Sequence, residues 1–274
     1  MVIIGTPFDR ENYFMADGDL AFMLEQAGFL AKYLDDDFVK YFRKCRRLKM
    51  LKNIKGAIFD MDGTLVDSLM LWDVLWEKFG VKFLNREGFR PVEEDDKIVR
   101  TKTLKDAMEH IHSKYNIGNS GEELLATANE LMINFYSNDV ELKKGVSEFL
   151  EYCYFKGIKM CIASATDISL IKLAVEHLKI GKYFADTLSC AEIGKGKEQP
   201  DIYLKALDSL GTSAEETCVF EDSHIAIDTA DKIRIKTVGI YDKYNYGQEE
   251  MKKIATVYIA EGETLEKLID NNCI

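Results

Sequence analysis

The sequence has no run of about 18 apolar residues, which is the length that a helix needs to cross the hydrocarbon core of a membrane. Its first residues, MVIIGTPFDRENYF, also have no basic segment ahead of an apolar stretch, which is the pattern of a secretory signal. We therefore expect no membrane as a partner and a cytoplasmic location.

Positive charge is also scarce. The chain has 36 Lys and Arg residues against 47 Asp and Glu residues, which gives a formal net charge of -11. Binding the phosphate backbone of a nucleic acid requires clustered Lys and Arg, so we expect no nucleic-acid partner. An anionic small ligand would need a local positive centre in this acidic chain, either a metal ion or a placed Lys.

Paired cysteines are missing as well. No Cys-x-x-Cys pair occurs, and no His or Cys cluster has the spacing of a zinc site. Several cysteines lie in apolar runs, which favours buried, reduced thiols in a compartment such as the cytoplasm. The six are Cys45, Cys153, Cys161, Cys190, Cys218 and Cys273.

What the sequence does contain, from Gly56 onward, is an alternation of short apolar runs with amphipathic segments. This alternation predicts an α/β fold with a Rossmann-like, doubly wound parallel sheet, in which ligands bind at the carboxyl ends of the strands. The expected strands are residues 57–59, 159–163, 187–190, 218–220, 237–240 and 257–259. The expected core helices are residues 146–156, 168–178, 201–210 and 224–231.

One connection is too long for a plain loop, because about 75 residues separate the first strand and its loop from the core helix near Gly145. Its pattern is helical, and Gly80 is expected to end the first helix. The apolar face of that helix consists of Leu71, Trp72, Leu75, Trp76 and Phe79. Further helices are expected over residues 104–115 and 122–136. Residues 69–142 are therefore predicted to form an inserted helical cap.

The domain boundaries follow from this insertion. Residues 53–68 and 143–274 are predicted to form the catalytic core, and residues 1–52 an N-terminal helical extension. The extension has amphipathic stretches and a basic cluster, but no catalytic pattern. A solvated charged face is the simpler interpretation of the cluster, and a site for a partner or an anionic surface is the alternative.

Two carboxylates, Asp60 and Asp62, follow the first expected strand, and Gly63 permits a sharp turn after them. Alone, such a pair would be an ordinary solvated turn. Other strands, however, bring further polar groups to the same edge of the sheet. These groups are Ser164, Lys197, Glu221 and Asp222. Because crowded carboxylates repel one another unless a hard cation lies among them, the set predicts a Mg²⁺ site and phosphoryl chemistry.

Together these residues resemble the motifs of the haloacid dehalogenase superfamily of phosphotransferases. The resemblance extends from about residue 53 to the carboxyl terminus. The helical insertion after the first motif is similar to the cap of the subfamily that contains sugar-phosphate phosphatases and β-phosphoglucomutase. The matching positions are Asp60, Asp62, Gly63, Thr64, Leu65, Asp67, Ser68, Ser164, Lys197, Glu221 and Asp222.

The resemblance implies a role for each group. Asp60 would be the nucleophile that forms an aspartyl phosphate, and Asp62 would be first the general acid and then the general base. Ser164 and Lys197 would bind the phosphoryl oxygens. The residues implied in substrate binding are Asp62, Ser164, Ala165 and Lys197. The implied cofactor is Mg²⁺, and its implied ligands are Asp60, Asp222, the main-chain carbonyl of Asp62 and Glu221, which would bind directly or through water.

The loop before Pro200 departs from the family pattern. It reads Lys197-Glu198-Gln199-Pro200-Asp201, where the family usually has a second Pro directly after the Lys, and Lys195 stands two residues earlier. Counting back from Pro200-Asp201 favours Lys197 as the implied phosphoryl-binding lysine.

The expected function is that of a Mg²⁺-dependent phosphatase acting on a small phosphorylated metabolite, a sugar phosphate or a similar phosphomonoester. Two alternatives stay open. A phosphomutase of the β-phosphoglucomutase type would need cap groups that retain a bisphosphate intermediate. The other alternative is a non-catalytic protein that binds a phosphorylated ligand. The sequence leaves the oligomeric state open between monomer and dimer.

Overall fold

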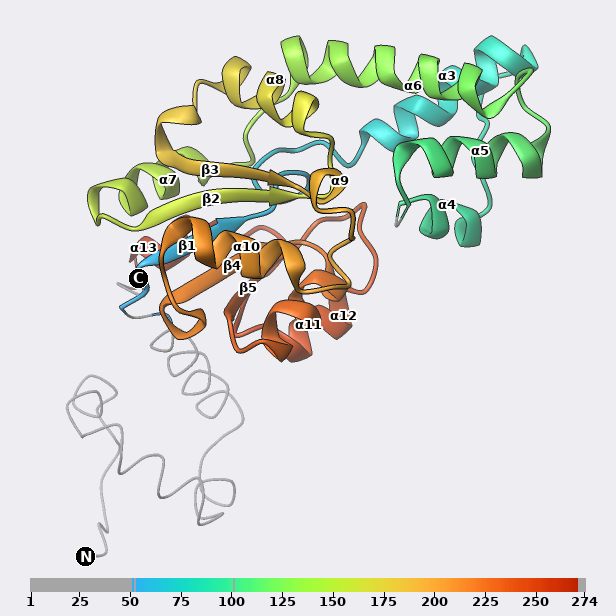
Figure 1. Ribbon diagram of the computed structural model, residues 1–274. Coiled ribbons are helices and arrows are strands. Elements are labelled where there is room, and N and C mark those ends of the chain that lie inside the picture. The colour runs from blue at the N-terminus through green and yellow to red at the C-terminus, as the bar shows by residue number, and fades with distance from the viewer. Residues whose placement is uncertain (1–50, 52, 101, 271–274) are drawn as a thin grey trace, which may run out of the picture. The chain divides into compact units, whose positions relative to one another are not determined.

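The computed structural model describes residues 51, 53–100 and 102–270 (Figure 1). The predicted N-terminal extension lies outside the described residues except for Leu51, and so do Cys45 and Cys273.

Six parallel strands form one sheet in the order β3-β2-β1-β4-β5-β6 (Figure 1). Since β1 lies between β2 and β4, the chain moves outward from β1 in both directions, and the crevice of a doubly wound sheet lies at this switch point. The predicted α/β fold is confirmed. The strands are β1 Gly56–Phe59, β2 Lys159–Ser164, β3 Phe184–Ser189, β4 Thr217–Glu221, β5 Lys236–Ile240 and β6 Val257–Ile259.

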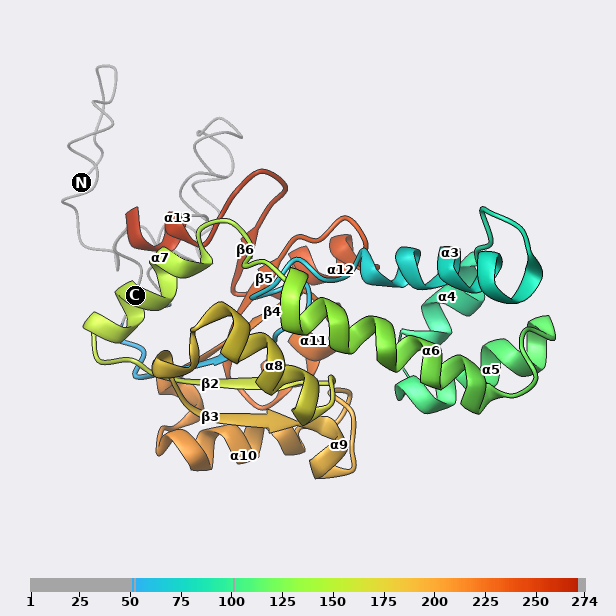
Figure 2. The same ribbon diagram turned by 90° about the horizontal axis from the view of Figure 1, so that it is seen from above.

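Helices cover both faces of the sheet (Figures 1 and 2). On one face lie α7 (Val146–Phe155) and α8 (Ile168–Leu178), and on the other lie α10 (Asp201–Leu210) and α11 (His224–Lys232). The remaining core helices are α9 Cys190–Ile193, α12 Gln248–Ile254 and α13 Glu266–Asp270.

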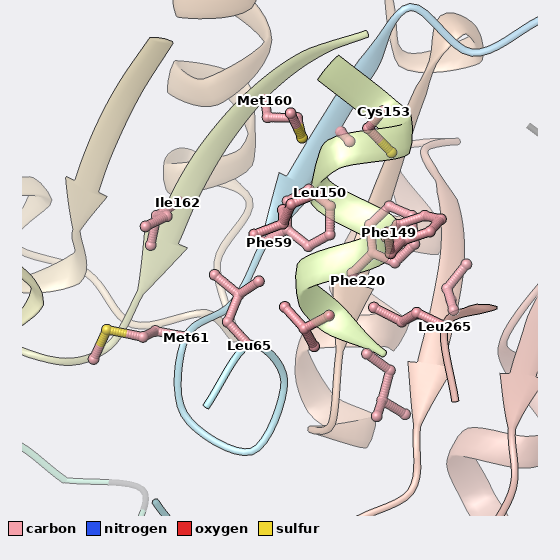
Figure 3. Packing of buried hydrophobic residues seen from close by; sticks show 14 of the residues in the cluster. Phe59, Met61, Leu65, Phe149, Leu150, Cys153, Met160, Ile162, Phe220 and Leu265 are labelled. Carbon is pink, nitrogen blue, oxygen red and sulfur yellow. The ribbon is translucent and has the colours of Figure 1, made fainter. Parts of the chain in front are cut away.

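The central strand is buried on both faces, which explains its continuous apolar sequence. Phe59 points toward α7, where its ring centroid lies 6.2 Å from that of Phe149 and 4.5 Å from that of Phe220 of β4 (Figure 3). Ile58 belongs to the cluster on the opposite face, with Ala206 of α10 and Ala230 of α11. The two cores hold the carboxyl end of β1 in a fixed position.

Between β1 and β2 the chain forms a helical insertion, defined here as residues 71–139. It has its own apolar core, which includes Trp76, Phe79 and Met108. The segments that enter and leave it run side by side, because Asp67 N donates to Glu141 O at 3.1 Å and Val66 pairs with Leu142. Its helices are α3 Leu71–Leu84, α4 Glu93–Val99, α5 Leu104–Tyr115, α6 Gly121–Asn134 and the π-helical turn η3 Phe135–Asp139.

The expectation that Gly80 ends the first helix of the insertion is wrong. Helix α3 continues to Leu84 and ends at Asn85, which adopts a left-handed conformation with φ 50°. Gly80 instead permits a close approach, because a Cβ there would lie 2.7 Å from both Arg86 O and Phe89 Cβ. The small residue marks where the following loop packs back onto the helix.

The third strand is also shifted from its predicted position. It covers Phe184–Ser189 rather than residues 187–190, and Cys190 begins α9. The first four residues of this strand are partly or fully exposed, so they present no apolar run that would mark the strand.

Two other properties can be read directly from the described residues. The cysteines among them, Cys153, Cys161, Cys190 and Cys218, are buried and free. Across residues 51, 53–100 and 102–270, no helix has both the length and the apolar character needed to cross a membrane.

Candidate active site

Three buried carboxylates meet at the carboxyl ends of β1 and β4. Asp60 directly follows β1 and its backbone N–H donates to Phe220 O of β4 at 3.0 Å, while Glu221 ends β4 and Asp222 follows it. One carboxylate oxygen from each of Asp60, Glu221 and Asp222 lies within 4.8 Å of the others. The pairing of β1 with β4 thus brings together acids that are far apart in the sequence.

The ammonium group of Lys197 lies between two of these acids. Its Nζ donates to Asp60 Oδ1 and to Glu221 Oε1, and its side chain is only 12% exposed. Lys195 lies elsewhere, because its Nζ donates to Asp201 Oδ1 at 2.7 Å and its side chain is 54% exposed. The structure therefore places Lys197, and not Lys195, at the carboxylates.

The acids lack enough positive charge to offset them. Burial raises the pKa of Asp60 to about 7, since the lowering effect of Lys197 is opposed by Glu221 and Asp62. Burial, followed by the charges of Asp60 and Glu221, raises the pKa of Asp222 well above its ordinary value. Among the described residues, Lys197 is the one lysine whose ammonium contacts any of these three buried carboxylates, which leaves a site that favours a further cation.

The surroundings of Asp222 are tightly packed. Asn245, from the loop between β5 and α12, donates through Nδ2 to Asp222 Oδ2 at 2.7 Å and to its main-chain carbonyl at 3.1 Å. Gly63 has a φ of 77°, and a Cβ at this position would lie 2.3 Å from Asp222 Oδ2. Only glycine fits between the turn after Asp60 and the acid from β4.

A lysine that follows the insertion fixes the same turn. Lys143 Nζ donates to Gly63 O at 2.7 Å and to Asp242 Oδ2 at 2.8 Å, and its backbone N–H donates to Leu65 O at 2.9 Å. The segment that returns from the insertion is thereby attached to the loop that carries Asp62.

Three hydroxyl groups hold the carboxylate of Asp62. Ser68 Oγ and Tyr136 OH both donate to Oδ1 at 2.6 Å, and Thr166 Oγ1 donates to Oδ2 at 2.6 Å. Asp62 is thus oriented by groups from the loop after β1, from η3 and from the loop after β2.

Ser164 and Ala165 lie at the same edge of the sheet. Ser164 is the last residue of β2, which pairs with β1, and it is buried. Its Oγ accepts a hydrogen bond from Thr166 N at 3.2 Å. Ala165 is exposed at the beginning of the loop.

Four residues of the site, Tyr136, Lys143, Thr166 and Asn245, do not belong to the motifs found in the sequence. Thr166 carried a usable signal, because it stands two residues after Ser164 at a predicted strand end. The other three are brought to the site by tertiary packing, and no feature of their local sequence indicates a role there.

The side chains of the site are of the kind that bind a hard divalent cation. The site's side-chain donors are carboxylate oxygens, which suit Mg²⁺, and the group that could hold a metal ion consists of Asp60, Glu221 and Asp222. The side chain of Asp62 is engaged by the three hydroxyls and is not part of this group.

Comparison with known proteins gives a consistent result. Residues 57–240 match the family described as haloacid dehalogenase-like hydrolase. The chain is 25% identical over 217 residues to a phosphorylated carbohydrates phosphatase from Thermotoga maritima, covering 78% of this chain and 98% of the relative. It is 26% identical over 176 residues to hexitol phosphatase B from Escherichia coli, covering 63% of this chain and 77% of the relative.

Among solved structures, the fold is similar to that of β-phosphoglucomutase from Clostridium difficile, with a TM-score of 0.61 and 19% identity. The similarity covers 80% of this chain and 96% of the other.

Proposed function

Because this chain belongs to the haloacid dehalogenase-like hydrolases, we propose that it hydrolyses a small phosphomonoester through a phosphorylated Asp60. The observation that carries the proposal is the contact of Lys197 Nζ with Asp60 and Glu221 at the carboxyl ends of β1 and β4. This contact places a fixed positive charge beside the carboxylate that would attack phosphorus, where negative charge develops in the transition state.

In the first step, a carboxylate oxygen of Asp60 forms a bond to phosphorus as the bond from phosphorus to the substrate's bridging oxygen breaks. The bridging oxygen takes the electron pair of the broken bond and a proton from Asp62, and leaves as an alcohol. Lys197 and Ser164 bind the phosphoryl oxygens during this transfer.

In the second step, Asp62 accepts a proton from a water molecule, whose oxygen attacks phosphorus. The bond between phosphorus and Asp60 breaks, which releases inorganic phosphate, restores the Asp60 carboxylate and leaves Asp62 protonated, as it was before the first step. The same residue thus acts as acid and then as base.

The cofactor of the proposal is Mg²⁺, held by Asp60, Glu221, Asp222 and the main-chain carbonyl of Asp62. When bound, it would offset the negative charges of the acids and of the phosphoryl oxygens.

Sugar phosphates are the proposed substrate class. The names of the two phosphatase relatives support this choice, since both act on phosphorylated carbohydrates or hexitols. The helical insertion, residues 71–139, is proposed to be the cap that contacts the sugar, because its last turn reaches Asp62 through Tyr136.

The test is a screen of the purified full-length protein with Mg²⁺ against sugar phosphates, hexitol phosphates and nucleotides. We expect release of inorganic phosphate in the wild type and no turnover in Asp60→Asn, because an amide does not attack phosphorus. Acid-quenched wild type should retain a labile phosphate that the variant lacks. A phosphomutase would instead isomerise the sugar phosphate without releasing phosphate. Wild-type turnover in Asp60→Asn would contradict the proposed mechanism.

A further inference from the structure

Tyr136 lies in the π-helical turn η3 at the end of the helical insertion. Turns of this kind are rare in proteins, and those that occur are often found at functional sites. The residue is 4% exposed and its ring packs in the core of the sheet domain with that core's apolar side chains. Its hydroxyl is the polar group on this otherwise apolar ring, and it donates a hydrogen bond to Asp62 Oδ1 at 2.6 Å.

The two oxygens of Asp62 have different numbers of partners. Oδ1 accepts from Ser68 and Tyr136, whereas Oδ2 accepts from Thr166 alone among the described residues. The Thr166 hydroxyl can rotate about its own bond, while Tyr136 is fixed by the packing of its ring. Among the described residues, Oδ2 therefore has one hydrogen-bond partner fewer than Oδ1 and retains the larger unused hydrogen-bonding capacity.

We propose that Tyr136 is a positioning residue for the leaving-group step: its hydroxyl holds Asp62 Oδ1 so that Oδ2 faces the bridging oxygen of the substrate. This inference rests on the proposed function. Asp62 delivers its proton from Oδ2 as the bond from phosphorus to the bridging oxygen breaks, and Tyr136 itself exchanges no proton with the substrate.

The position of Tyr136 in the chain also links the orientation of Asp62 to the helical insertion. Its turn ends six residues before Gly145, at the point where the chain returns from the insertion to the core. The orientation of the proton donor consequently depends on how that turn is seated. Ser68 supports the same oxygen from the core side, within the loop that carries Asp62 itself.

The need for a proton donor depends on the basicity of the leaving group. Substrates with different leaving groups therefore test the role of Tyr136 in proton donation. A weakly basic aryl oxide leaves without protonation, whereas an alkoxide must be protonated. The experiment measures kcat/KM of the full-length protein with Mg²⁺ for 4-nitrophenyl phosphate, phenyl phosphate and benzyl phosphate. The value of kcat/KM reports the transfer to Asp60 and is insensitive to the later hydrolysis of the phospho-aspartate.

For Tyr136→Phe we expect kcat/KM to fall by less than about threefold with 4-nitrophenyl phosphate and by about tenfold or more with benzyl phosphate. The larger loss is a fraction of the roughly 10²- to 10⁴-fold rate increase that a general acid contributes. Asp62→Asn should show the same dependence with larger losses. The matched control is Tyr258→Phe, which removes a hydroxyl that donates to Gln248 Oε1 at 3.0 Å outside the site, and it should behave like the wild type for all three substrates.

An equal loss with all three substrates would assign Tyr136 a merely structural role and overturn the proposal, and so would no loss at all. If Tyr136→Phe does not fold, Thr166→Val tests the same orientation from the other oxygen, with the same dependence on the leaving group expected. A wild type that hydrolyses none of the three compounds contradicts the proposed function itself, and the inference that rests on it then fails too.

Discussion

Two lysines separated by one residue have different partners at the site. Lys197 Nζ contacts Asp60 and Glu221, and these carboxylates raise its pKa well above the ordinary value although burial alone would lower it. Lys195 forms an exposed ion pair with Asp201, and such pairs contribute little.

We therefore predict that Lys197→Ala lowers kcat by about a hundredfold to a thousandfold, because it removes a fixed charge beside the transferring phosphoryl group. Lys195→Ala should change kcat by less than about threefold. The measurement is kcat of both variants at saturating Mg²⁺ and substrate. The reverse ranking would show that the ion pairs described above do not reflect the working site.

At this scale the sequence identified the charged groups better than their neutral neighbours. Asp60, Glu221 and Lys197 stand at or after strand ends in recognisable motifs, so their meeting could be expected from the order of the strands. Tyr136 and Asn245 carry no such signal, because a Tyr in a helix and an Asn in a loop are common everywhere. Their partners are set by how the insertion and the loop after β5 pack.

Between elements, the loop after β5 also reaches the helical insertion. Tyr246 OH donates to Asp96 Oδ2 of α4 at 3.1 Å, and Lys97 Nζ lies 4.6 Å from the centroid of the Tyr246 ring. Its neighbour Asn245 contacts Asp222. A single loop thus contacts both the acid cluster and the proposed cap.

We predict that Tyr246→Phe lowers kcat/KM for sugar phosphates by about threefold to tenfold, because a hydrogen bond to a carboxylate that holds the insertion against the core is lost. The Mg²⁺ concentration for half-maximal activity should stay the same. Tyr244→Phe, two residues away in the same loop, is the matched control and should retain wild-type kcat/KM. Unchanged kcat/KM in Tyr246→Phe would mean that this contact does not contribute to activity.

A buried acid joins α4 to α5 within the insertion. Asp95 is fully buried and accepts from Tyr115 OH at 2.6 Å and Lys114 Nζ at 2.7 Å, while His110 Nε2 lies 3.2 Å from Oδ1. Burial would raise the pKa of Asp95, but the hydrogen bonds from Lys114, Tyr115 and His110 lower it to about 2.

A lowered pKa in the folded state means that ionised Asp95 stabilises the fold above its unfolded pKa of about 3.9 and that this contribution disappears as the pH falls toward 2. Asp95→Asn should therefore lower the melting temperature on the order of 5 °C at pH 7. The difference from the wild type should shrink below about pH 4. Glu122→Gln, which changes an exposed carboxylate of α6, is the control. A difference that is constant from pH 7 to pH 3 would contradict the assignment.

The elements with local signals were predicted most closely. Helix α5 has the predicted bounds, because Thr103 caps its start through Asp106 N and Asn116 ends it in a left-handed conformation. The ends of α3 and β3 were set by tertiary packing instead. Gly80 is required by the loop that crosses it, and β3 is a partly exposed strand at the sheet edge, without an apolar run.

For the whole molecule, the proposed cofactor leads to a direct prediction. Exhaustive chelation should eliminate phosphatase activity, and Mg²⁺ should restore it, because the buried carboxylates otherwise repel the phosphoryl oxygens. Ca²⁺ should not restore it, since its larger and looser coordination shell would misplace Asp60. Undiminished hydrolysis after chelation would count against Asp60, Glu221 and Asp222 as ligands.

The central position of β1 has a consequence for how this protein is made. Phe59 pairs with Ile162 of β2 and with Phe220 of β4, so the sheet joins segments that leave the ribosome at very different times. Closing such long loops costs entropy before the contacts stabilise anything, so we expect these pairings to form late in folding. A nascent chain that has already exposed Asp60 and Asp62 still lacks the acids of β4. A cation held by all three carboxylates would bind only the completed fold, and by mass action it would then oppose unfolding.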